Sequence, residues 1–191
     1  MKPKLLIVEV WYLGDLVIGT AFLREAVKQF DVTLLAKPYA VDLQPRLWPG
    51  VKIYPFNAPW TAFTKKYRLW RWQLLEMLRL RRSMAAEKFD IGLSTRRQVG
   101  LGGDPRDHFL LKIFGAKERI GFPYFGSQMF LTRPLPRPDP ESHRYESWRT
   151  AGKALGIDLP PRDQLVPPPI RHEKTILMHT GARLPVRVWP L

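Results

Sequence analysis

Short apolar runs alternate with helix-forming stretches along most of the sequence, and this alternation limits the possible folds more than any other feature. The predicted strands are residues 4–10, 31–36, 51–56, 89–94 and 118–122. The predicted helices are residues 16–30, 63–87, 104–114 and 142–155. Strands that alternate with helices are typical of a parallel sheet, whose strands need crossover connections. The sequence therefore predicts an α/β protein with a Rossmann-like, doubly wound parallel sheet.

Two proline-rich stretches follow the last of these strands. The prolines of RPLPRPDP (133–140) exclude a helix and favour an extended surface segment. LPPRDQLVPPP (159–169) is typical of a semi-rigid linker, and KTILMHTG (174–181) is typical of another buried strand that runs into a glycine turn. We therefore expect one domain over residues 1–158 and a linker over 159–173. Residues 174–191 would be the first strand and turn of a truncated second domain.

Composition restricts the classes of partner and of chemistry. Lys and Arg total 31 and Asp and Glu total 17, so the net charge is +14 and favours polyanions or an anionic surface, although a solvated basic surface is also possible. The chain has no cysteine and its four histidines lack paired ligand spacing, so we expect no metal site and no cofactor. Glu9 interrupts the N-terminal apolar run, which does not resemble a signal peptide. We expect a cytoplasmic protein, at most peripheral on a membrane.

Asp15 follows the first predicted strand, in LLIVEVWYLGDLVIGT (5–20). This carboxylate could be a helix N-cap, or it could act as a general base at the edge of the sheet where α/β proteins bind ligands. The two roles are compatible. The small residues Gly19 and Thr20 would let a ligand or a backbone approach closely. A dinucleotide site is not expected, since no G-x-G-x-x-G follows the strand.

Three arginines surround the end of the fourth predicted strand: Arg96, Arg97 and Arg106. They could bind phosphate, or they could be solvated. Asp104, Pro105 and Asp107 have the pattern of a helix start, which is a sufficient structural reason for them. Near the C-terminus, HTGARLPVRVWPL (179–191) places Arg183 and Arg187 after a glycine turn, as a diphosphate-binding edge would require.

The stretch KKYRLWRWQLLEMLRLRR (65–82) predicts a basic amphipathic helix. One face of the helix would carry four arginines, Arg68, Arg71, Arg79 and Arg82. Trp70 and Trp72 would accompany them, as in helices that lie on an anionic membrane. A core helix with a solvated basic face and a nucleic-acid-binding helix are the alternatives.

Several stretches together resemble glycosyltransferase family 9, the heptosyltransferase-like enzymes of lipopolysaccharide assembly. They are the opening strand with LGD and TAFLREA, FDIGLS (89–94), GAKERIGF (115–122), HRYE (143–146) with ALGI (154–157), and the block 179–190. The resemblance implies the N-terminal half of a GT-B fold, with an acceptor-binding domain first and a nucleotide-sugar-binding domain second. It also implies an inverting reaction that needs no metal.

The resemblance assigns roles to individual residues. Asp15 would be the base, with Gly14, Thr20, Arg96 and Arg106 at the acceptor. Thr180, Gly181, Arg183 and Arg187 would contact the donor, where Arg187 replaces the family's usual lysine. The implied partners are a nucleotide-sugar such as ADP-heptose, a lipid-linked saccharide and an anionic membrane surface, with no nucleic acid. Because the sequence ends as the second half begins, we expect an incomplete donor pocket. The alternative function is a non-catalytic basic module that binds membrane or nucleic acid.

Overall fold

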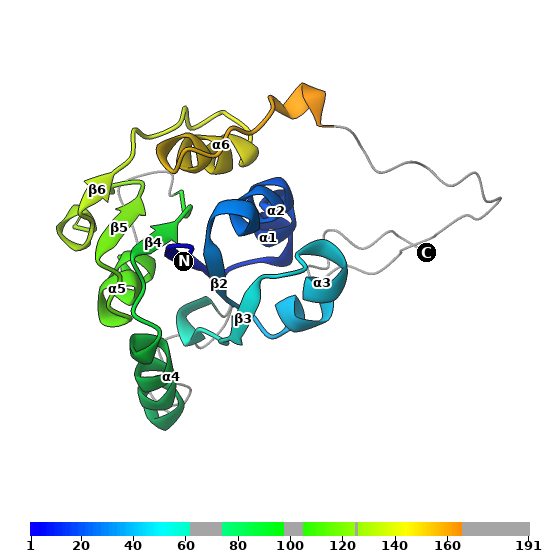
Figure 1. Ribbon diagram of the computed structural model, residues 1–191. Helices are drawn as coiled ribbons and strands as arrows, with labels where there is room; N and C mark the ends of the chain where they lie inside the picture. Colours follow the sequence, from blue (N-terminus) through cyan, green and yellow to red (C-terminus); the bar gives the residue numbers. More distant parts are fainter. Residues whose placement is uncertain (62–73, 98–104, 125, 166–191) are drawn as a thin grey trace, which may run out of the picture.

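A computed structural model describes residues 1–61, 74–97, 105–124 and 126–165, and its centre is a six-stranded parallel sheet of order β3-β2-β1-β4-β5-β6 (Figure 1). The strands are β1 (Lys4–Glu9), β2 (Asp31–Ala36), β3 (Lys52–Pro55), β4 (Ile91–Ser94), β5 (Glu118–Gly121) and β6 (Arg133–Pro134). The helices are α1 (Leu13–Ile18), α2 (Thr20–Gln29), α3 (Tyr39–Leu47), α4 (Leu74–Ala86), α5 (Arg106–Ile113) and α6 (Tyr145–Ala154). The expected α/β fold with a doubly wound parallel sheet is confirmed.

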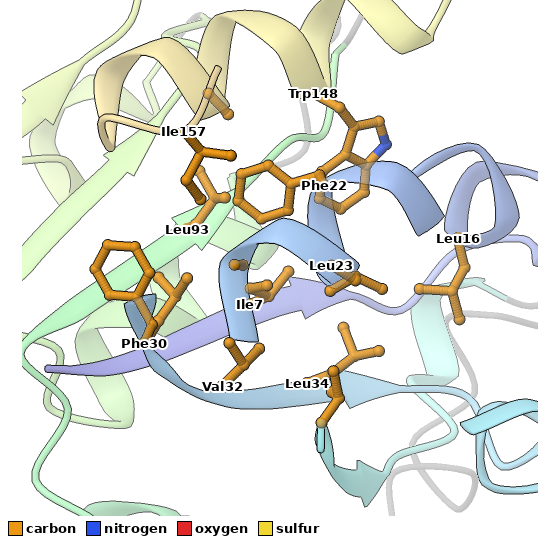
Figure 2. Packing of buried hydrophobic residues seen from close by; sticks show 14 of the residues in the cluster. Ile7, Leu16, Phe22, Leu23, Phe30, Val32, Leu34, Leu93, Trp148 and Ile157 are labelled. Carbon is orange, nitrogen blue, oxygen red and sulfur yellow. The ribbon is translucent and has the colours of Figure 1, made fainter. Parts of the chain in front are cut away.

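The central strand β1 is buried on both faces, which explains its nearly continuous apolar sequence. Leu5 and Ile7 face the core that α2, α3 and α6 cover, whereas Leu6 and Val8 face the core beneath α4 and α5. Figure 2 shows the first core, in which Phe22 of α2 and Trp148 of α6 pack over Ile7. The two aromatic rings lie 5.2 Å apart between centroids. Side chains of this size each contribute about 1.5–3 kcal/mol when they are fully buried.

The predicted helix over residues 16–30 is wrong in one respect, because the structure has two helices there. Gly19 ends α1 and begins α2. The break brings Gly19 against the ring of Trp148, which leaves no room for a larger residue. The helical periodicity of this stretch predicted helix correctly, but it does not indicate the change of direction between the two helices.

The helix α3 was not predicted. It contains Pro45 in its interior and begins directly after Pro38. Proline in a helix removes one backbone hydrogen bond, so the sequence reads as a loop. Tertiary packing compensates for the lost hydrogen bond, since Ala40 in the helix and Trp48 directly after it are both fully buried.

The remaining predicted elements agree with the structure wherever it describes them. The predicted helix 63–87 corresponds to α4 from Leu74 onward, and residues 63–73 lie outside the described residues, as does Asp104 before α5. The extended segment 133–140 begins with β6, a short sixth strand that pairs with β5. The predicted strand 174–181 also lies outside the described residues. None of the described helices has the length and apolar character needed to cross a membrane.

Candidate active site at the carboxyl end of the sheet

The order of the strands reverses direction between β1 and β4, and this point forms the centre of the candidate site. In open α/β sheets, ligands bind outside the carboxyl ends of the strands at such a switch point. Glu9 ends β1, and Thr95 immediately follows β4. The parallel register of the two strands places both residues at the same edge of the sheet. The segments that follow the strands supply the other side chains of the site.

Asp15 lies in the first turn of α1, directly after β1. The expectation that it caps this helix is wrong, because the N-cap residue is Tyr12. Its carboxylate still benefits from the positive end of the helix. The Asp15 side chain is 22% exposed, and its Oδ1 lies 3.5 Å from Nε of Arg144. Asp15 is therefore anchored by an ion pair and remains accessible to a ligand.

Arg144 links three parts of the site. It precedes α6, and its side chain is 14% exposed. In addition to its ion pair with Asp15, one of its terminal nitrogens lies 3.4 Å from Oε2 of Glu9, and the other donates a hydrogen bond to the backbone oxygen of Thr95. These contacts attach α6 to the carboxyl ends of β1 and β4.

Glu9 is a deeply buried acid of the site, with 1% of its surface exposed. Burial raises its pKa to about 7 because a carboxylate loses solvation in the interior, although the nearby Arg144 opposes this effect. The Oε2 atom accepts a hydrogen bond from the hydroxyl of Thr95 at 3.4 Å. No donor in the described residues reaches Oε1. Sequence reasoning noted Glu9 only as an interruption of an apolar run, yet a charge inside a buried strand was the signal that could have identified it.

Tyr39 begins α3 and faces the same pair of acids. Burial is the main reason why its pKa rises to about 12, and the negative charges of Glu9 and Asp15 raise it further. Its hydroxyl is buried and has no hydrogen-bond partner among the described residues. The hydroxyl is therefore neutral at physiological pH and can donate a hydrogen bond to a ligand. The unpredicted helix α3 thus places this side chain in the site.

Two arginines of the predicted acceptor site each lie over a tryptophan ring. The guanidinium carbon of Arg96 is 3.7 Å from the ring centroid of Trp11, and that of Arg106 is 5.5 Å from the ring centroid of Trp60. Such cation–π contacts restrict the position of a guanidinium, and a guanidinium is the side-chain group best suited to binding oxyanions. The indole of Trp11 donates a hydrogen bond of 2.6 Å to Asp107, which is buried.

The other candidate residues have different surroundings. Arg97 donates hydrogen bonds to the backbone oxygens of Asp139 and Ser142, and so holds the loop before α6. The Thr20 hydroxyl accepts a hydrogen bond of 3.0 Å from the indole of Trp48. Gly14 is exposed, and an added Cβ there would meet nothing within 4 Å.

Many of the predicted contact residues lie outside the described residues: Arg68, Trp70, Arg71, Trp72, Thr180, Gly181, Arg183 and Arg187. Arg79 and Arg82 are described and are exposed on α4. The described parts of the chain contain no group of three or more side chains that could hold a metal ion.

No model of a known protein family and no curated protein matches this sequence. The solved structures that match its fold include two transferases. A glycosyl transferase of family 9 from Veillonella parvula DSM 2008 aligns over 82% of this chain with a TM-score of 0.61 and 15% identity. The ADP-heptose lps heptosyltransferase II of E. coli aligns over 81% with a TM-score of 0.55 and 17% identity. The chain is similar in fold to family 9 glycosyltransferases.

The similarity covers only part of each of the two known proteins. The chain spans 43% of the Veillonella protein and 40% of the E. coli protein, which is less than half of each. The resemblance seen in the sequence motifs is thus confirmed at the level of the fold.

Proposed function

We propose that this chain is the acceptor-binding half of a glycosyltransferase that moves a sugar from a nucleotide-sugar to a lipid-linked saccharide. The observation that carries the proposal is the position of Asp15. It is a partly exposed carboxylate, anchored by Arg144 at the switch point of the sheet, in a fold shared with glycosyltransferases.

In this proposal Asp15 is the general base. Its carboxylate accepts the proton of an acceptor hydroxyl as the hydroxyl oxygen forms a bond to the anomeric carbon of the donor sugar. The bond from that carbon to the nucleotide diphosphate breaks on the opposite face, so the anomeric configuration inverts. Arg144 orients the carboxylate, and Tyr39, whose pKa is raised by the same acids, is proposed to donate a hydrogen bond to the acceptor. Positive side chains and helix ends, rather than a metal ion, are proposed to stabilise the departing diphosphate.

Arg96 and Arg106 are proposed to bind anionic groups of the acceptor. Each guanidinium lies over a tryptophan ring, and this contact reduces the conformational entropy lost on binding. The exposed Gly14 leaves open space beside Asp15, and Thr20 stays a predicted contact. Thr180, Gly181, Arg183 and Arg187 stay predicted donor contacts, in the second domain of a GT-B fold. ADP-heptose, or a similar compound, is the proposed donor.

The decisive test is sugar transfer by the full-length protein that contains this chain. We expect Asp15→Asn to lower the transfer rate by about 10²–10⁴-fold, the usual loss for a general base. Asp42→Asn is the matched control, because Asp42 also lies in the first turn of a helix but is exposed and is not part of the ion pair with Arg144. Undiminished transfer by a folded Asp15→Asn variant would reject the assignment.

We also propose that α4 contacts the inner face of the cytoplasmic membrane, with the protein otherwise in the cytoplasm. The exposed surface of α4 mixes charge with apolar side chains, because Arg79 and Arg82 accompany Leu75 and Leu78, which are 71% and 58% exposed. An apolar pocket of about 320 Å³ lies beside them, lined by Phe56, Met77, Leu78, Leu80, Arg81, Leu110, Ile113 and Phe114. A helix with this composition fits the interface of an anionic bilayer.

The alternative of a non-catalytic basic module is not favoured. The two solved structures named above are described as transferases, and the acids gather at the edge of the sheet where such folds bind ligands. We propose no nucleic-acid partner.

A further inference from the structure

Arg144 is shared by two carboxylates that differ in their access to solvent. Asp15 is 22% exposed and pairs with Nε at 3.5 Å, whereas Glu9 is 1% exposed and pairs with a terminal nitrogen at 3.4 Å. The proposed reaction uses Asp15 alone. Glu9 is therefore a buried acid that contacts the same cation as the proposed base but has no role in the mechanism above.

Glu9 has charged or titratable neighbours on every element that surrounds it. The nearby acids favour its neutral form, and the nearby arginines favour its ionised form. The groups are Arg144 before α6, Asp15 in α1, Asp107 in α5, Arg96 after β4 and Tyr39 in α3. Burial outweighs the arginines and places the pKa of Glu9 at about 7. Its charge therefore changes within the physiological range of pH.

The charge of Glu9 determines how strongly the guanidinium of Arg144 interacts with each of the two acids. When Glu9 is neutral, Asp15 is the stronger partner, and the guanidinium holds it. When Glu9 is ionised, it attracts the same guanidinium from a site with little solvent, where a charge interaction is stronger than at the surface. The hold of Arg144 on Asp15 then weakens, and the Asp15 carboxylate is freer to accept a hydrogen bond from a ligand hydroxyl.

We propose that Glu9 is a positioning residue, which competes with Asp15 for the guanidinium of Arg144 and so controls how firmly the Asp15 carboxylate is held. The inference rests on the proposed function in one respect, namely that Asp15 is the base. The competition itself is a property of the folded chain and can be measured without any transfer reaction.

The measurement is a pH titration of this chain by NMR, following the side-chain carboxyl carbon of Asp15 and the Nε–H group of Arg144. In the wild type, both signals should show a step with a midpoint near pH 7, where Glu9 ionises. Glu9→Gln keeps the shape of the side chain but removes its charge, so the step should disappear from both signals. Asp15→Asn identifies the Asp15 signal.

Two further variants make the result specific. Glu146→Gln is the matched control, because Glu146 also pairs with an arginine, Arg149 at 2.8 Å, at the start of the same helix α6, and this variant should keep the step. Arg144→Gln removes the shared cation, so the step at Asp15 should shrink to the direct effect of the Glu9 charge while the carboxyl signal of Glu9 still titrates. If Glu9→Gln does not fold, the titration of Arg144→Gln tests the proposal on its own.

The proposal is overturned if the wild type shows no step at Asp15, if the step persists in folded Glu9→Gln, or if it keeps its full size in folded Arg144→Gln. In the full-length protein, transfer by the wild type should fall as the pH is lowered through the pKa of Glu9, and Glu9→Gln should remove this dependence. An active Asp15→Asn variant, together with the expected step in the wild type, would reject the function and keep the competition between the acids. An inactive Asp15→Asn variant, together with no step at Asp15 in the wild type, would do the reverse.

Discussion

The indole of Trp148 occupies the space in which a side chain at Gly19 would lie. An ideal Cβ on Gly19 would be 2.6 Å from Cζ2 and 2.7 Å from Cε2 of that ring. Trp148 is fully buried in the core between α2 and α6, and close-packed interiors leave little space for a ring to move. The contact therefore fixes both the break between α1 and α2 and the distance of α6 from them.

We expect Gly19→Ala to destabilise the fold by about 1–3 kcal/mol, as overpacking of a core does. Urea denaturation checks this value. Gly14→Ala is the control, since an added Cβ there meets nothing within 4 Å, and it should be neutral or slightly stabilising. A Gly19→Ala variant as stable as the wild type would show that the ring of Trp148 can shift.

Glu9 and His108 should give opposite dependences of stability on pH. The pKa of Glu9 is raised to about 7, so its stabilising contribution is complete below pH 4.5 and is lost as the pH rises through 7. Burial lowers the pKa of His108 to about 4, so its contribution is complete above pH 6.5 and is lost as the pH falls through 4. Each effect amounts to about 3 kcal/mol at about 1.4 kcal/mol per pKa unit, and in the wild type they largely cancel.

Single variants should separate the two contributions. Between pH 4.5 and 6.5, Glu9→Gln should become more stable as the pH rises, because only the His108 effect is left. His108→Leu should become less stable over the same range. Unfolding free energies from urea titrations at several pH values check both slopes. Parallel slopes for the two variants would contradict this prediction.

The side chain of Glu87 connects strand β1 with strand β3. It accepts hydrogen bonds from Tyr54 at 2.9 Å, from Lys4 at 3.3 Å and from Lys52. The hydrogen bond from Lys52 is the main reason why the pKa of Glu87 falls to about 2. Glu87→Gln should therefore lower the unfolding free energy at pH 7 by about 1–2 kcal/mol, and this loss should shrink as the pH falls from 4.5 to 2.

The control for Glu87 is a pair on the surface. Glu25 and Lys28 lie 2.7 Å apart on α2 with side chains that are 42% and 66% exposed. Glu25→Gln should change stability by less than about 0.5 kcal/mol. Equal losses from the two substitutions would show that the contacts of Glu87 contribute no more than a surface pair.

Vesicles that contain anionic lipid test the membrane proposal. Each Lys or Arg near such a surface contributes about 1 kcal/mol, so Arg79→Gln with Arg82→Gln should weaken binding by roughly 30-fold. Higher salt should weaken the wild type in the same direction. Lys28→Gln with Lys153→Gln is the control, since both residues lie on helices of the opposite face of the sheet. Sedimentation with vesicles, and in parallel with nucleic acid, separates the two kinds of partner.

Local patterns predicted the strands and the location of Asp15, because buried parallel strands are short apolar runs and ligands bind at their carboxyl ends. They could not predict Arg144 as a partner, since it lies 135 positions from Glu9 and only the fold brings the two together. They also missed α3, in which packing around Trp48 overrides the cost of Pro45. The proposed competition of Glu9 and Asp15 for the guanidinium of Arg144 depends on the folded arrangement of separate segments, so no local sequence pattern indicates it.

Proline ends both outer strands of the sheet, β3 at Pro55 and β6 at Pro134. Proline has no backbone N–H, so neither residue can donate a hydrogen bond to an added strand. β3 also begins with the charged Lys52, and β6 has only two residues. Both features discourage pairing with the strand edge of another molecule, which is a common route to aggregation. A concentrated solution of this chain should therefore resist growth of its sheet into intermolecular β-structure.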